Sequence, residues 1–179
     1  TCLTLVFLAA QTLNNPEALA LHLFTLLCLC TASMLLYSIA HDIWGPTFSL
    51  AASGFFAAHP FVLWLTKQPN SETPFLAVLA LTFLLFTRTL RQAIPTSPLA
   101  LAVGASVGVG MLIRPISIFL ALPLCIALIG WGQGPRILRA RAALFIVIGN
   151  LLVVGPWEAW VYSRVGQVVP LGTVGARSM

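Results

Sequence analysis

Apolar residues fill the chain in long runs, and short polar or proline-containing breaks separate these runs. A helix needs about 20 apolar residues to cross the hydrocarbon core of a bilayer, and fewer when its ends reach the interface. The pattern therefore predicts an all-α fold, a polytopic transmembrane helix bundle of about six to seven membrane segments. The apolar runs are residues 1–10, 18–40, 47–65, 75–86, 99–113, 116–131 and 142–157.

The breaks predict how the chain turns between helices. The runs 99–113 and 116–131 meet at Arg114-Pro115, which predicts a tight helical hairpin with Arg114 at its tip. Residues 132–141 are predicted to form a loop. The Gly- and Val-rich tail, residues 165–179, is expected to extend outside the bilayer.

Composition narrows the class of protein. Hydrophobic residues make up 59% of the chain and charged residues 7%, against about 25% charged in an ordinary soluble domain. So few charges cannot cover a soluble globule, which excludes a soluble enzyme, a disordered segment and a disulfide scaffold. The net charge of +5 would suggest nucleic acid in a soluble protein. Here the arginines lie in breaks between apolar runs, which indicates membrane topology and no nucleic-acid partner.

The cations also predict an orientation, because short cytoplasmic loops collect Lys and Arg. The clustered cations fall on one side of the alternating breaks, which we place in the cytoplasm of a multi-pass cell-membrane protein. That side holds His41-Asp42, Arg88, Arg91, Arg136, Arg139 and Arg141, and the other holds Lys67, Arg114, Arg164 and Arg177. The polar groups that could take part in binding or catalysis are thereby expected to converge on the extracytoplasmic face.

Arg114 is the most distinctive candidate for chemistry. It interrupts apolar sequence, and Pro115 disfavours helical backbone at Arg114 itself. A lipid-facing arginine at mid-bilayer would cost about 2.5–3.5 kcal/mol, so Arg114 is expected to face a polar cavity or the interface. Its guanidinium suits a lipid phosphate or pyrophosphate. The alternative is an interfacial arginine that reaches the headgroups from a hairpin tip.

Three weaker candidates for substrate binding accompany Arg114. Glu72 either lines a cavity, where it binds a sugar hydroxyl or a metal, or interacts with the dipole at the start of a helix. Lys67 either contacts lipid phosphate or pairs with Glu72, and its alternative is a solvated loop lysine. For His59, the alternative to a site role is a buried histidine satisfied by hydrogen bonding.

Metal and redox motifs are missing from the sequence. The cysteines lie inside apolar runs, and Cys28 and Cys30 are spaced so that a helix would point them to different faces. No metal ligand set and no definite cofactor are predicted, and a divalent metal at Glu72 stays open. Gly104 and Gly108 fit the small-xxx-small pattern for close helix packing.

Six short segments stand out in chain order. They are LYSIAHDIWG at 36–45, AAHP at 57–60, SETP at 71–74, GASVGVGMLIRP at 104–115, GPW at 155–157 and GQVVPLGT at 166–173. In this order they resemble motifs of the polytopic glycosyltransferases of the GT-C superfamily. The chain is similar to the family 39-like group, which includes protein O-mannosyltransferases and the aminoarabinose transferases that modify lipid A.

This resemblance implies transfer of a sugar from a polyprenyl-phosphate-linked donor to a protein, lipid or glycan acceptor on the extracytoplasmic face. It implies that Arg114 binds the carrier phosphate and that Glu72 lines the donor or acceptor cavity. It also implies that residues 1–179 are a partial transmembrane domain. The general base is then expected upstream of Thr1, so the catalytic residue is unknown here and the fragment alone is expected to be inactive.

Two other classes of protein stay open on the sequence. One is a transporter or channel segment, although no internal repeat is evident and the polar groups do not gather at the midplane. The other is a non-catalytic membrane scaffold, in which Glu72 and Arg114 serve only capping and topology.

Overall fold

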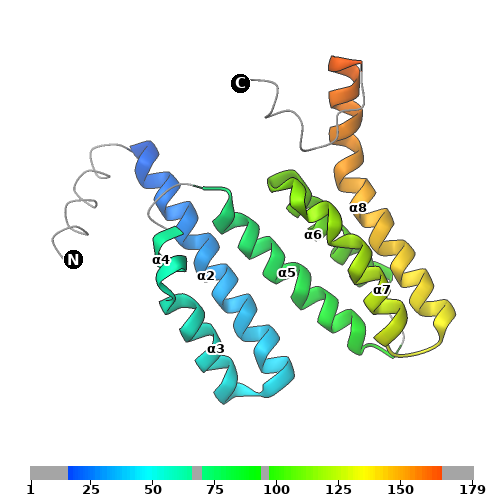
Figure 1. Cartoon of the computed structure of the whole chain (residues 1–179), viewed down its shortest axis with the longest axis horizontal. Helices are drawn as coiled ribbons and strands as arrows, with labels where there is room; N and C mark the ends of the chain where they lie inside the picture. The colour runs from blue at the N-terminus through cyan, green and yellow to red at the C-terminus, as the bar shows by residue number, and fades with distance from the viewer. Residues whose placement is uncertain (1–15, 66–69, 94–96, 167–179) are drawn as a thin grey trace. The chain divides into compact units, whose positions relative to one another are not determined.

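The computed structural model describes residues 16–65, 70–93 and 97–166, and every regular element in these ranges is a helix (Figure 1). The all-α prediction is therefore confirmed for the described part of the chain. The predicted first run, residues 1–10, and almost all of the predicted tail lie outside it. In chain order the elements are α2 (Pro16–Trp44), α3 (Pro46–Ala58), α4 (Pro60–Leu65), α5 (Glu72–Arg91), α6 (Ser97–Ile113), the 3-10 helix η1 (Pro115–Phe119), α7 (Ala121–Trp131) and α8 (Arg136–Val165).

Two boundaries differ from the hydropathy pattern. The run 47–65 is two helices rather than one, because Pro60 holds His59 in extended backbone with φ −64° and ψ 126°. The predicted loop 132–141 is mostly wrong, because α8 already begins at Arg136 and carries its arginines in the first turns. Good helix formers such as Arg, Leu and Ala follow Pro135, and they extend the helix beyond its apolar part.

The chain divides into two compact units, Thr1–Ala77 and Val78–Met179, and each is described here by itself. In the first unit, α2 packs against α3, and α3 contacts the short helix α4. Gly45 makes the turn between α2 and α3 with φ 84°, a left-handed conformation that glycine adopts without strain. Pro46 then begins α3, where its fixed φ suits the first helical turn.

In the second unit, α6 packs most extensively against α8, which also packs against α7. Successive contacts move toward the C-terminal end of both helices, from Gly104 beside Ile146 to Gly108 beside Val153. The helices α6 and α8 therefore run parallel. The chain does reverse at Arg114, as the hairpin prediction requires. The main partner of α6, however, is α8 rather than α7.

Glycines allow this close approach. A Cβ on Gly104 would collide with the carbonyl oxygen of Ile146, and one on Gly108 would lie 2.8 Å from the Cβ of Val153. The predicted packing role of this pair is therefore confirmed. Gly149 makes the reciprocal contact from α8, where a Cβ would collide with the carbonyl oxygen of Leu101.

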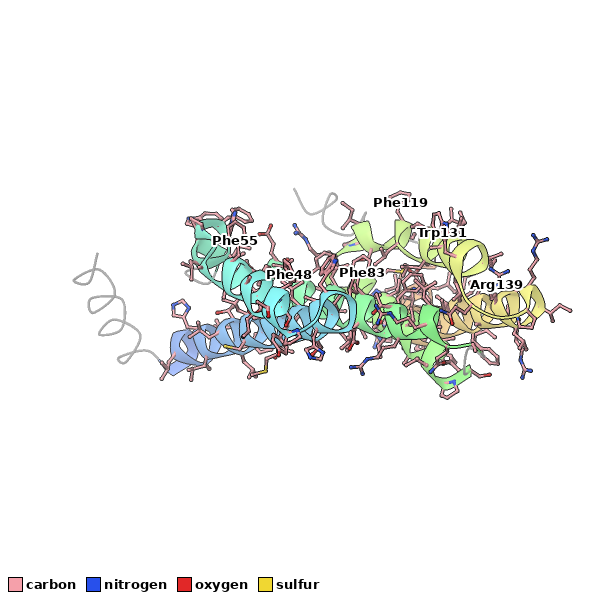
Figure 2. The ribbon with its side chains drawn as sticks, turned by 90° about the horizontal axis from the view of Figure 1, so that it is seen from below. Phe48, Phe55, Phe83, Phe119, Trp131 and Arg139 are labelled. Carbon is pink, nitrogen blue, oxygen red and sulfur yellow. The ribbon has the colours of Figure 1, made fainter. Side chains whose placement is uncertain are left out.

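The outer surfaces of the helices are apolar. Figure 2 shows Phe55 and Phe119 projecting outward. Between 39% and 77% of the side chains of Phe48, Phe55, Phe83 and Phe119 is exposed. Soluble proteins rarely expose so many large apolar side chains, whereas lipid tails accept them. Three described helical spans are long and apolar enough to cross a membrane: Leu19–Trp44, Glu72–Arg91 and Arg136–Arg164. The apolar helical segments Ser97–Ile113 and Pro115–Trp131 are shorter.

Candidate functional site

Arg114 occupies the break between α6 and η1. Its backbone is extended, with φ −142° and ψ 115°, as the following proline predicted. The Arg114 N–H donates to the Gly110 carbonyl at 2.8 Å and closes α6, while the Arg114 carbonyl accepts from the Ser117 N–H at 3.1 Å and opens η1. The residue is half-buried. A guanidinium at a rigid helix break is therefore held near one end of the second unit.

Ser117 lies close to this break and was not singled out from the sequence. It is 4% exposed, and its Oγ is buried without a hydrogen-bond partner in the described part of the chain. Other helical hydroxyls donate to a carbonyl of the preceding turn, as Ser49 does to Pro46 and Ser163 to Trp160. A lone serine in an apolar run gives no sequence signal for this difference.

Asn70 organises the polar segment before α5, in the break between the predicted apolar runs 47–65 and 75–86. Its Oδ1 accepts from the N–H groups of Glu72 and Thr73 and from the Thr73 hydroxyl, each at 3.1 Å. Its Nδ2 donates to the Leu65 carbonyl at 3.0 Å. Asn70 therefore caps α5 and ties the end of α4 to it. The known preference of Asn for helix N-caps was the available signal.

Glu72 is the first residue of α5 and is half-buried. Its position in the first turn places a carboxylate where the helix dipole favours negative charge. The structure thus provides the environment for the interaction of Glu72 with the helix dipole. The alternative role of Glu72, lining a substrate cavity, stays a prediction. Thr73, the residue between Glu72 and Pro74, is 1% exposed and locked by Asn70, so the backbone that carries Glu72 is well fixed.

His59 corrects an expectation. It is exposed rather than buried, because it lies at the break between α3 and α4. Its Nδ1 accepts from the Phe61 N–H at 3.3 Å, and its carbonyl accepts from the Leu63 N–H at 3.0 Å. The imidazole therefore begins α4 in the manner of an N-cap.

The predicted site residues are distributed over both units. His59 and Glu72 belong to the first unit, Arg114 belongs to the second, and Lys67 lies outside the described residues. The structure brings Asn70, Glu72 and Thr73 together. The convergence of all four predicted residues on one face stays a prediction.

Metal-binding groups do not cluster in the described ranges. No three His, Cys, Asp or Glu side chains lie there close enough to hold an ion. Cys28 and Cys125 are free thiols, and Cys125 donates only a long contact of 3.7 Å to the Ala143 carbonyl. A metal at Glu72 would therefore need ligands from elsewhere.

The aromatic residues late in α8 form a compact group. The rings of Trp157 and Trp160 lie 5.4 Å apart, and the Arg164 guanidinium stands 6.0 Å from the Trp160 ring centre. Indole rings with a stacked cation are typical of the membrane–water interface. This geometry favours an interfacial position for the segment.

Comparison with known families identifies the chain. A family model described as dolichyl-phosphate-mannose-protein mannosyltransferase matches residues 4–160, which include all four predicted site residues. No match was found among curated proteins or among solved structures. The match covers most of the chain and confirms the GT-C resemblance found in its motifs. Three helices among the described residues are able to cross a bilayer, and the chain belongs to the dolichyl-phosphate-mannose-protein mannosyltransferase family of membrane glycosyltransferases.

Proposed function

We propose that this multi-pass chain belongs to an enzyme that transfers a sugar from a polyprenyl-phosphate-linked donor to an acceptor on the extracytoplasmic face of the cell membrane. The observation that carries the proposal is the family match over residues 4–160. The family description names dolichyl-phosphate mannose as the donor and protein as the acceptor, so these are the first substrates to test. Lipid and glycan acceptors are the alternatives.

The charge distribution of the second unit supports the orientation. Arg88 and Arg91 lie in the last turn of α5, and α8 begins at Arg136. The Gln133 N–H donates to the Leu90 carbonyl at 3.3 Å, so both helix ends lie at the same end of this unit. Arg114 lies toward the opposite end, because α6 runs parallel to α8. A basic cytoplasmic end then leaves Arg114 on the extracytoplasmic side.

The residue roles follow from chemistry. Arg114 binds the carrier phosphate, because a planar guanidinium forms paired hydrogen bonds with phosphate oxygens. Glu72 accepts a hydrogen bond from a sugar or acceptor hydroxyl, with Lys67 and His59 as weaker contacts of the same substrates. None of these roles is that of a general base, and a divalent metal is not required by them.

The test is an assay of sugar transfer in membranes that contain the protein expressed from its complete reading frame. Radiolabelled dolichyl-phosphate mannose and other polyprenyl-phosphate sugars serve as donors. We expect Arg114→Ala and Glu72→Gln to lower transfer at least about tenfold, the loss typical for one charged contact to a substrate. The matched controls are Arg164→Ala, which removes another arginine of the second unit, and Glu158→Gln, which neutralises another half-buried acid.

The outcomes separate the hypotheses. Full activity in both site variants would remove the residue assignment while leaving the transferase intact. A correctly inserted wild-type protein that transfers no sugar from any polyprenyl-phosphate donor would instead favour a non-catalytic scaffold.

A further inference from the structure

The hydroxyl of Ser117 differs from the other buried hydroxyls in the described part of the chain. Its Oγ is buried and makes no hydrogen bond there. Each of the others donates to an oxygen: Thr25, Ser49, Thr73, Thr82, Thr89 and Ser106. A buried hydroxyl without a partner is unfavourable, because it has lost its hydrogen bonds to water. Ser117 therefore calls for an acceptor that the described residues do not supply.

Ser117 is also the buried residue of η1. Ile116 and Ile118 are 69% and 51% exposed, while Phe119 is 77% exposed and projects outward (Figure 2). Since η1 packs against α6 and α7, an apolar residue would be the ordinary choice at its inward position. The inward position instead carries a polar side chain, and the apolar side chains of η1 face outward.

Arg114 lies one turn of 3-10 helix before Ser117. The Ser117 N–H donates to the Arg114 carbonyl at 3.1 Å. Three residues is the repeat of a 3-10 helix, so the two residues follow each other along one side of the segment, about 6 Å apart along its axis. Because one phosphate group accepts several hydrogen bonds at once, a guanidinium and a hydroxyl at this spacing can serve the same phosphate.

Water is the ordinary partner of a buried hydroxyl, but it needs two to four polar groups around it. The residues that follow Ser117 on the buried side of the chain are Leu120 and Leu124, which belong to or pack against the apolar core of this unit. Their side chains form no hydrogen bonds. An ionised phosphate requires only donors, and both Arg114 and Ser117 supply them. A phosphate therefore fits this environment better than water.

The inference rests on the proposed binding of the carrier phosphate at Arg114. We propose that Ser117 is a second binding residue of that site, and that its hydroxyl donates to an oxygen of the same phosphate. The Oγ is closed off from the surface in the structure, so η1 shifts when the carrier binds. The other four residues of η1 are exposed, so little packing opposes this shift.

The test compares carrier binding with stability in the full-length protein, purified in detergent. The ligands are dolichyl phosphate and dolichol, which lacks the phosphate, and binding is measured by titration calorimetry. Ser117→Ala should weaken the binding of dolichyl phosphate about tenfold, as expected for one hydrogen bond to a charged group, and should leave dolichol binding unchanged. Without ligand, the same variant should unfold at the wild-type temperature or above it, because it removes a hydroxyl that has no partner.

A matched control removes a buried serine hydroxyl that does have a partner. The Ser49 hydroxyl bonds the Pro46 carbonyl at 2.7 Å. Ser49→Ala should therefore lower the unfolding temperature and leave dolichyl phosphate binding unchanged, the reverse of Ser117→Ala. Ser117→Cys keeps the shape of the side chain but has only a weak donor, so it should lose affinity as Ser117→Ala does.

The outcomes separate this inference from the proposed function. Wild-type affinity in Ser117→Ala, with weakened binding in Arg114→Ala, would overturn the role of Ser117 and keep the phosphate site at Arg114. If Ser117→Ala keeps its affinity but unfolds more easily, the hydroxyl holds a structural water instead. Wild-type protein that binds dolichyl phosphate no better than dolichol would overturn both residue assignments. Because the assay measures binding alone, a protein that shows the expected Ser117 effect but transfers no sugar would contradict only the proposed function.

Discussion

The side-chain amide of Asn70 donates a hydrogen bond to the carbonyl oxygen of Leu65 at 3.0 Å, and this contact joins the end of α4 to the start of α5. The same side chain accepts the N–H groups of Glu72 and Thr73. One residue therefore satisfies open backbone groups of two helices. It also fixes the backbone on which Glu72, a predicted substrate contact, is carried.

Replacement of Asn70 should destabilise the first unit. Asn70→Ala removes the cap and should cost about 0.5–2 kcal/mol of unfolding free energy. Asn70→Asp keeps an acceptor for the two N–H groups but loses the donation to Leu65, so its loss should be smaller. Thermal unfolding of the purified protein in detergent, with Ser71→Ala as the exposed neighbouring control, checks the order. Equal stability of Asn70→Ala and Ser71→Ala would contradict the capping role.

Glycine substitutions should separate packing positions from open ones. Gly104→Ala and Gly149→Ala place a methyl group against a facing backbone carbonyl, which cannot rotate away as a side chain can. We expect each to destabilise the second unit by about 1–3 kcal/mol. Gly54→Ala and Gly130→Ala meet nothing within 4 Å and should be neutral or slightly stabilising, because alanine is the better helix former. The midpoint of thermal unfolding distinguishes the two pairs, and a similar response at all four positions would refute the close contact.

Much of this architecture was available from local sequence. The apolar runs located the helices, Pro115 placed extended backbone at Arg114, and the Gly104–Gly108 spacing indicated a close helix contact. These features depend on residues that are close in sequence, so a local sequence pattern can predict them. Pro60 also indicated the helix break at His59, but the hydropathy pattern alone did not reveal it.

Other features depend on partners far along the chain. The pairing of α6 with α8 is one such feature, because the sequence of neither helix shows that α6 packs more extensively against α8 than against α7. Gly149 is another, since a single glycine becomes significant only when Leu101 is known to face it. The unsatisfied hydroxyl of Ser117 likewise follows from tertiary burial rather than from its neighbours in sequence.

A buried pair of hydroxyls should couple α5 to α6. Thr82 and Ser106 lie 3.0 Å apart through their hydroxyl oxygens, and both are buried. Thr82→Val and Ser106→Ala each remove one partner and keep a similar shape. A double-mutant cycle on unfolding in detergent should give a coupling of about 0.6 kcal/mol, the average for such bonds in membrane proteins. Thr87→Val, whose hydroxyl bonds only within its own helix at Leu84, is the control and should show no coupling to Ser106→Ala.

Pro115 holds Arg114 in the extended backbone that presents it for the proposed phosphate contact. Arg114→Lys keeps the charge but loses the planar fork, so the KM for the polyprenyl-phosphate donor should rise by roughly tenfold with a smaller change in kcat. Pro115→Ala leaves the guanidinium intact but lifts the restriction that keeps Arg114 extended, and α6 can then continue through it. We expect the same rise in KM from this displacement.

The matched control for that experiment is Pro98→Ala, which removes a proline from the exposed first turn of α6 without touching the break at Arg114. Steady-state kinetics in membranes with varied donor concentration separates the effects. If Pro115→Ala matches Pro98→Ala and only Arg114→Lys raises KM, the guanidinium binds the donor regardless of backbone conformation. If all three variants retain wild-type kinetics, Arg114 does not contact the donor phosphate, and its place at the helix break is explained by interfacial position alone.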